Sequence, residues 1–260
     1  MEDGASIQPG GFLHSLPSPA PSNISTTSTS SLPHPRARPL RPGSEKEDAT
    51  RRYIDNVLMK IARRYAKKFL PPEGDELVGY TSMSDVARDL SSVVDVLWIS
   101  GTPSLQIPYL LNVALKVTEY ITAFDPAPPA TFKLLKKLDH AFSSLMKGED
   151  SLTGDLLPGF EGGRSAGMTK TDMVRCKSLV EATRILIVEH MTKPPEQPNP
   201  ENDEDVVMES ETDAEGNKRF PEPDEQLEMD VARVYEMSIV CLNEKLDSGG
   251  FTIGVATGSR

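Results

Sequence analysis

Apolar side chains recur at steps of three and four residues through most of this 260-residue chain. That spacing is the period of one face of an α-helix, whereas a half-buried strand would show strict alternation. No segment alternates convincingly, and no repeat recurs at a fixed period. The sequence therefore predicts an all-α fold, a small bundle of about five to six helices. The helices are expected at about residues 47–69, 84–99, 107–124, 130–147, 169–193 and 224–246.

Local signals place several helix ends. Pro103 is expected to end the second helix, and Pro108 fits best in the first turn of the third, where its missing N–H costs little. Gly148 is expected just past the end of the fourth helix. Thr169 and Asp172 form an [ST]-x-x-[DE] capping box at the start of the fifth. These signals favour antiparallel helices joined by short links.

Composition predicts that only part of the chain folds. Hydrophobic residues make up 37%, and the 22 prolines and 18 glycines are clustered. Segments with few apolar side chains cannot offset the entropy of ordering. The Gly-rich residues 149–167 are expected to form a mobile loop. The expected organisation is a disordered Ser/Pro-rich tail at 1–46, a helical core at 47–192, an acidic disordered insert at 193–223, a C-terminal helix on the core at 224–248 and a disordered tail at 249–260.

Several classes of protein are excluded. The only cysteines are Cys176 and Cys241, so a disulfide scaffold is ruled out, and two thiols fit a reducing compartment. No charged region followed by an apolar one opens the chain, so we expect no secretory signal. The longest apolar stretches fall short of the ~20 residues that a membrane span needs. We therefore expect a soluble intracellular protein.

The sequence offers no chemistry that would make an enzyme. Neither an H-E-x-x-H motif nor a paired CxxC appears, so a metal site is not expected. His140 is interpreted as a boundary histidine on a helix. The Gly-rich residues 159–165 lack the lysine of a phosphate-binding loop, and no G-x-S-x-G elbow is present. We predict no catalytic residues and no cofactor.

Charge is the most informative feature for function. The net charge is −11, yet residues 51–68 carry seven basic groups against one acid, and residues 196–230 carry fourteen acids against two basic groups. The basic helix can be a solvated face, a docking surface for an acidic protein, or a phosphate-binding surface for nucleic acid. It can also pair with the acidic insert of its own chain. The nominated partner-binding residues are Arg52, Lys60, Arg63, Arg64 and Lys67.

Three helical blocks resemble a known family. They are RRYIDNVLMKIARRYAKKF, LSSVVDVLWISGTPSLQIPYLLNVALKVTEYI and PPATFKLLKKLDHAFSSLM, within about residues 51–190. They resemble the fungal family of subunit 11 of the general transcription factor TFIIH. The resemblance rests on helical blocks, because no catalytic signature accompanies them, and it carries over no individual contact residue.

The resemblance implies a nuclear, non-catalytic protein that associates with TFIIH in RNA polymerase II transcription. The family's role is to bind the XPB-type translocase subunit and promote its dissociation from the complex. The implied partners are TFIIH protein subunits, with no membrane and no small-molecule substrate. The alternative is a DNA-binding accessory protein of recombination or chromatin that acts through the basic first helix. Trp98 and the third helix are expected to lie in the core.

Overall fold

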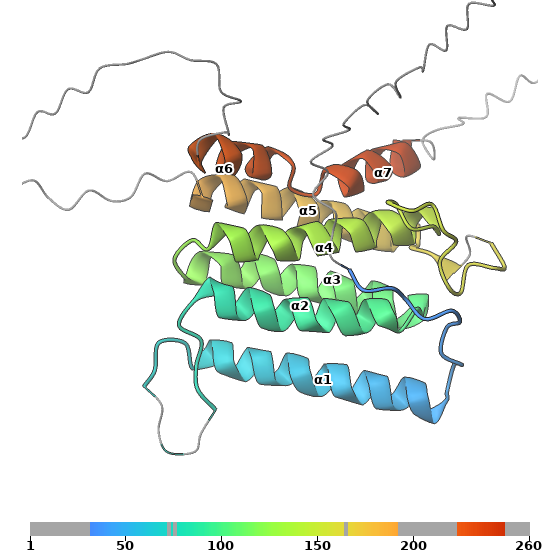
Figure 1. Cartoon of the computed structure of the whole chain (residues 1–260), viewed down its shortest axis with the longest axis horizontal. Helices are drawn as coiled ribbons and strands as arrows, with labels where there is room; N and C mark the ends of the chain where they lie inside the picture. Colours follow the sequence, from blue (N-terminus) through green and yellow to red (C-terminus); the bar gives the residue numbers. More distant parts are fainter. Residues whose placement is uncertain (1–31, 72–73, 75–76, 164–165, 192–222, 248–260) are drawn as a thin grey trace, which may run out of the picture.

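A computed structural model describes residues 32–71, 74, 77–163, 166–191 and 223–247 (Figure 1). Most of the predicted N-terminal tail, the acidic insert and the C-terminal tail lie outside these described residues. Within the described part, the fold is all-α, as predicted, with a single isolated β-bridge between Glu149 and Leu156. The elements are α1 (Glu45–Ala66), α2 (Met83–Ile99), α3 (Pro103–Tyr120), the short 3-10 helix η1 (Ile121–Ala123), α4 (Pro128–Lys147), α5 (Lys170–Met191), α6 (Pro223–Ala232) and α7 (Glu236–Asp247).

The helices form two adjoining rows (Figure 1). One row runs α1, α2, α4 and α7, each packed on the next, and the second contains α3 and α5, with α6 packed on α5. α1 therefore lies at one edge of the bundle, beside α2, while α4 lies between α2 and α7. None of the helices in the described part is long and apolar enough to cross a membrane.

The hydrophobic core is centred on α4, where 14 of the 20 residues are buried. This follows from its position, because α2, α3 and α7 each pack against it. The predicted apolar stripe of α4, which includes Phe132 and Phe142, is buried. Trp98 of α2 is 1% exposed, which confirms its predicted place in the core. Six of the buried residues are polar or charged, and among them Lys137, Asp139 and His140 each bond a group on another segment.

The last predicted helix is in fact two helices, so the prediction of one helix at 224–246 is wrong. Tyr235 has a φ of 57°, which interrupts the helical backbone between α6 and α7. Buried Asp139 of α4 accepts hydrogen bonds from the backbone N–H of Ser238 at 2.7 Å and of Met237 at 3.2 Å. Burial raises the pKa of Asp139, while these bonds act in the opposite direction. Asp139 thus supplies the cap that lets α7 begin anew.

The predicted start of the third helix is also wrong. α3 begins at Pro103, which occupies its first position, and Pro108 lies inside the helix. A proline fits the first position because that N–H has no intrahelical partner, so Pro103 starts α3 as readily as it ends α2. The predicted start of the fifth helix and the predicted end of the fourth are confirmed. Thr169 and Asp172 exchange the hydrogen bonds of a capping box, and Gly148 adopts a left-handed φ of 84° after α4.

Residues 32–44 differ from the predicted disordered tail, whose end was placed at residue 46. They run along the ends of α2 and α3 without regular structure. The Arg36 N–H donates to the Ile99 carbonyl at 3.3 Å, and the Leu40 N–H donates to the Thr102 hydroxyl at 2.9 Å. The Leu40 side chain is buried. Buried Leu40, partly buried Leu32 and these backbone bonds hold a segment whose composition alone predicts disorder.

The Gly-rich loop after α4 is packed more closely than its composition predicts. Leu157 and Phe160 are each 4% exposed, and both belong to the core. The His140 ring bonds the Asp150 carboxylate at 2.8 Å across the start of the loop. Burial acts to raise the pKa of Asp150, but the Leu152 N–H and His140 outweigh it and hold that pKa below its usual range. His140 is buried rather than at the boundary.

Candidate partner-binding surface

The nominated basic residues share the outward side of α1. At about 100° per residue, Arg52, Lys60, Arg63 and Lys67 fall within an arc of about 80°. The buried side of the helix, marked by Ile54, lies roughly opposite this arc. Arg52, Lys60 and Arg63 are exposed, and Lys67 is half-buried. These four residues are called the basic face below.

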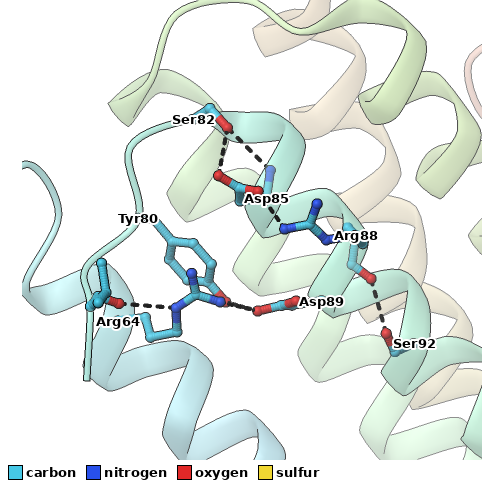
Figure 2. Close-up of polar contacts among 8 residues, drawn as sticks. Arg64, Tyr80, Ser82, Asp85, Arg88, Asp89 and Ser92 are labelled. Atoms are coloured by element: carbon cyan, nitrogen blue, oxygen red, sulfur yellow. Dashed lines mark hydrogen bonds and ion pairs between the residues drawn. The ribbon is translucent and has the colours of Figure 1, made fainter. Parts of the chain in front are cut away.

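Arg64 points away from the basic face and toward α2 (Figure 2). Its guanidinium lies 4.0 Å from the centre of the Tyr80 ring and forms an ion pair with Asp89 of α2 at 2.5 Å. Its Nε donates to the Val78 carbonyl at 3.1 Å. The Tyr80 hydroxyl donates to the same Asp89 carboxylate at 2.7 Å. Arg64, Tyr80 and Asp89 are called the latch below, since they join α1 to α2.

The latch has a distinct electrostatic character. Burial and the hydrogen bond to Asp89 raise the pKa of Tyr80 well above its ordinary value, so its hydroxyl stays a donor at neutral pH. The Arg64 and Asp89 side chains are only 20% and 29% exposed. Partial burial and several hydrogen bonds distinguish this ion pair from an exposed pair of negligible strength. The charge of Arg64 is thus used to hold α1 in place.

Neighbouring charges on α2 belong to that helix alone. Ser82 caps α2, accepting a hydrogen bond from the Asp85 N–H, and its hydroxyl donates to the Asp85 carboxylate (Figure 2). Asp85 forms an ion pair with Arg88, one turn along the helix. The Ser92 hydroxyl donates to the Arg88 carbonyl. This group stabilises the start of α2 and does not reach α1.

The chain that follows α1 returns to cap it. The Tyr80 N–H donates to the Arg64 carbonyl, and the Phe69 N–H donates to the Tyr80 carbonyl. Gly79 passes so close that a β-carbon there would lie 1.9 Å from the carbonyl oxygen of Lys67. Only glycine permits this approach of two backbones. Phe69 adopts a φ of 63° within the same turn.

Aromatic contacts attach this end of α1 to α3 and to the residues that follow it. The Tyr65 ring stacks on Tyr120 with centroids 3.8 Å apart, and Phe69 lies 5.4 Å from Phe124. The Lys68 ammonium lies 4.6 Å from the Tyr65 ring centre. α1 is therefore held at its C-terminal end by aromatic and polar contacts. Along its length it is held by buried Ile54 and Ile61 and by the hydrogen bond that the Tyr109 hydroxyl donates to Asp55 at 2.6 Å.

Sequence reasoning found the basic face but missed the latch. Tyr80 and Asp89 lie in a link and on a separate helix, and no spacing rule connects them to Arg64. In the sequence, Gly79 lies in the link between the first two predicted helices, and nothing there indicates a close backbone contact. A glycine followed by an aromatic residue just before a capped helix was the only available signal, and it is weak.

A hollow lies between α5 and α7. It has a volume of about 430 Å³ and is lined mainly by apolar atoms. The Lys177 ammonium donates to the Asn243 side chain at 3.2 Å, and Arg184 donates to the Val234 carbonyl at 2.6 Å. No group of histidine, cysteine and carboxylate side chains that could hold a metal ion occurs in the described part of the chain. The lining residues are Lys177, Glu181, Arg184, Ile185, Ile239, Leu242 and Asn243.

Comparisons with known proteins bear on this arrangement. A family described as subunit 11 of the general transcription factor TFIIH matches residues 79–243, which is well over half of the chain and extends from the end of the α1–α2 link into α7. An uncharacterized protein of Schizosaccharomyces pombe is 25% identical over 147 residues, covering 55% of this chain and 78% of that protein. No solved structure matches the chain. The matched range begins after α1, so the basic face lies outside it.

Proposed function

Because this chain belongs to the family of subunit 11 of the general transcription factor TFIIH, we propose that it is a non-catalytic, nuclear TFIIH-associated subunit in RNA polymerase II transcription. The observation that carries the proposal is the family match across α2 to α7. Its proposed action is to bind the XPB-type translocase and promote dissociation of that subunit from the complex. The action requires binding alone.

Release by binding has a simple thermodynamic condition. A ligand shifts an equilibrium only by the difference between its affinities for the two states. The chain must therefore bind the free translocase more tightly than it binds the translocase within TFIIH. To raise the ratio of released to bound translocase tenfold, that difference must be about 1.4 kcal/mol.

The two parts of the molecule are proposed to contribute differently. The matched helices α2 to α7 supply the shared body of the family, and the basic face of α1 adds a contact to an acidic surface of the partner. Arg52, Lys60 and Arg63 project toward solvent and are suited to this role. Charged contacts of this kind raise the association rate and set orientation more than they raise affinity. Arg64 is proposed to act indirectly, by positioning α1 through the latch.

The test is a tagged purification from nuclear extract at physiological salt. TFIIH subunits, including the XPB-type translocase, are expected to co-elute and to be identified by mass spectrometry. Purified TFIIH is then incubated with increasing amounts of the chain, and the released translocase is separated by gel filtration. Recovery of DNA-repair or chromatin proteins in place of TFIIH would contradict the proposal, as would co-elution without any concentration-dependent release.

The DNA-binding alternative makes a different prediction for salt. The basic face presents exposed cations in one arc, which is the arrangement that phosphate contacts require. Binding through four phosphates would give a slope of about −3.6 in a plot of log affinity against log salt. Association through a mainly apolar protein contact is expected to show a much shallower slope. Fluorescence anisotropy with a labelled duplex of random sequence measures the salt dependence of DNA binding. Biolayer interferometry with purified TFIIH measures the salt dependence of protein binding.

A further inference from the structure

The C-terminal end of α1 combines cations with exposed apolar side chains. Phe69, Leu70 and Val78 are 60%, 58% and 49% exposed. Phe69 and Leu70 lie three and four residues after the last residue of α1, and the carbonyl of Val78 accepts a hydrogen bond from Arg64. Exposed large apolar side chains gathered beside charged residues are typical of an interaction site. Together with Lys60, Arg63 and Lys67 they are called the α1 end patch below.

Two of the three cations of this patch are exposed on the outer side of α1. Lys60 and Arg63 are exposed and take part in no ion pair within the described part of the chain. Lys60, Arg63 and Lys67 are spaced three and four residues apart, so their like charges lie side by side on the helix and repel one another. An acidic ligand would relieve this repulsion. The patch is therefore suited to a segment that carries carboxylates next to apolar side chains.

The chain itself contains a segment with that chemistry. Residues 192–222 carry ten acidic residues against three basic ones. Within them, Val206, Val207 and Met208 are flanked by three acids on one side and by Glu209 and Glu211 on the other. This stretch, DEDVVMESE at residues 203–211, is called the acidic motif below. Its apolar centre matches the apolar side chains of the patch, and its flanks match the cations.

The segment leaves the described structure close to the patch. α5 ends at Met191, and the preceding His190 ring bonds the Phe124 carbonyl at 2.9 Å. Phe124 in turn contacts Phe69 of the patch, with ring centroids 5.4 Å apart. Figure 1 shows the end of α5 and the end of α1 at the same end of the bundle. Eleven residues separate Met191 from the acidic motif. A chain of that length can span at most about 36–40 Å, so the motif lies within reach of the patch.

From these observations we propose that the acidic motif of residues 203–211 binds the α1 end patch of its own chain and masks the basic face until a partner displaces it. Tethering makes this contact effective even when the affinity of the motif is low. A short flexible linker gives an effective concentration of about 1 mM, so a motif with a dissociation constant of about 100 µM would occupy the patch in about ten molecules of eleven.

The first test uses the full chain and a labelled peptide. The probe is a synthetic fluorescein-labelled peptide of residues 202–215, and binding is followed by fluorescence anisotropy. Its targets are the intact chain and a full-length variant with a neutralised motif (D203N, E204Q, D205N, E209Q and E211Q). The peptide is expected to bind the neutralised variant about tenfold more tightly than the intact chain, because the tethered motif competes only in the latter.

Matched variants identify the surface. In the neutralised background, K60E with R63E is expected to abolish peptide binding, whereas K133E with R175E, which reverses two exposed cations on α4 and α5, is expected to leave it unchanged. Phe69→Ser tests the apolar part and is expected to weaken binding severalfold. Equal affinity of the peptide for the intact and neutralised chains would overturn the proposal, and so would the absence of binding to either.

A second test places the motif directly. A carbodiimide reagent joins a carboxylate to a lysine amine only when the two are in contact, so it should link residues 203–211 to Lys60 or Lys67 in the intact chain. The links are expected to disappear at about 1 M salt, where the screening length is about 3 Å. A mixture of isotopically light and heavy chains distinguishes the source of the motif, and links found mainly between chains would contradict masking in cis. Both tests use the isolated protein, so they can fail while TFIIH association stands.

Discussion

α4 and α1 are similar in length but are held in the molecule in different ways. Fourteen of the 20 residues of α4 are buried, whereas only Glu47, Ile54 and Ile61 are buried among the 22 residues of α1. α4 is enclosed by α2, α3 and α7. α1 is attached at an edge by its two buried isoleucines, by the latch and by aromatic contacts at one end. α4 is thus the central helix of the core, whereas α1 covers one edge of it.

The family match follows the same division. It starts at residue 79, after α1, and covers the helices that surround the core. An edge helix whose outer face makes few contacts with the body can change its surface charge without loss of packing. We therefore expect α4 and its neighbours to contribute most of the stability, and we propose that the outer face of α1 contributes to recognition.

The largest effect is expected in the core. Phe142→Ala should destabilise the protein by about 3–5 kcal/mol, because a fully buried aromatic side chain leaves a cavity that its neighbours fill only in part. Urea denaturation followed by circular dichroism measures the change. The matched variant Phe69→Ala, at 60% exposure on the α1 side, should cost less than about 1 kcal/mol. A similar loss of unfolding free energy for the two substitutions would contradict the contrast between α4 and α1.

The next effect concerns the backbone contact that closes α1. Gly79→Ala should lower the free energy of unfolding by about 1–3 kcal/mol. The new methyl group would lie 1.9 Å from the Lys67 carbonyl oxygen and must force the two segments apart. The control is Gly162→Ala, where nothing lies within 4 Å of the added carbon. Thermal unfolding of both variants measures the difference. Equal melting temperatures for the two variants would show that the chain around Gly79 accommodates the added methyl group without loss of stability.

A smaller and more local effect is expected from the latch. Asp89→Asn removes the carboxylate that pairs with Arg64 and accepts from Tyr80, and it should weaken the attachment of α1 by about 1–2 kcal/mol. Hydrogen exchange should show lower protection of α1 amides with no change in α4. Asp85→Asn is the control, because its ion pair with Arg88 stays within α2. Loss of protection in both helices would show that α1 and α4 unfold as one unit.

The smallest of these effects depends on pH and lies at the far end of α4. The pKa of Asp150 is lowered in the folded chain, so its contribution to stability is complete above the ordinary carboxyl pKa of about 4 and is lost as the pH falls through the lower folded value. Asp150→Asn should lower stability at neutral pH and flatten the pH dependence between about pH 5 and pH 2. Urea midpoints across this range test it. An unchanged pH profile would assign the acid sensitivity to other carboxyl groups.

The sequence was enough to predict the core and most helices, because the period of apolar residues records which faces are buried. It failed where contacts between distant residues decide the structure. Asp139 restarts α7 after the break at Tyr235 from 99 residues away, and no local signal in the last segment reveals this. The latch was missed for the same reason. Arg64 has the same sequence signature as the basic face, and only the position of Asp89 shows that its charge is used inside the fold.

The most direct test of the division between body and outer face is the affinity of the chain for purified TFIIH. Biolayer interferometry at physiological salt would compare the wild type, the basic-face variant R52E/K60E/R63E and the control K133E/K170E/R175E, which reverses three exposed cations elsewhere. Both variants should keep the wild-type melting temperature, since exposed substitutions change stability by only about 0.5 kcal/mol. We predict that the basic-face variant binds at least about tenfold more weakly, a loss of about 1.4 kcal/mol, and that the control is unchanged. Equal affinity of a folded basic-face variant would contradict the account.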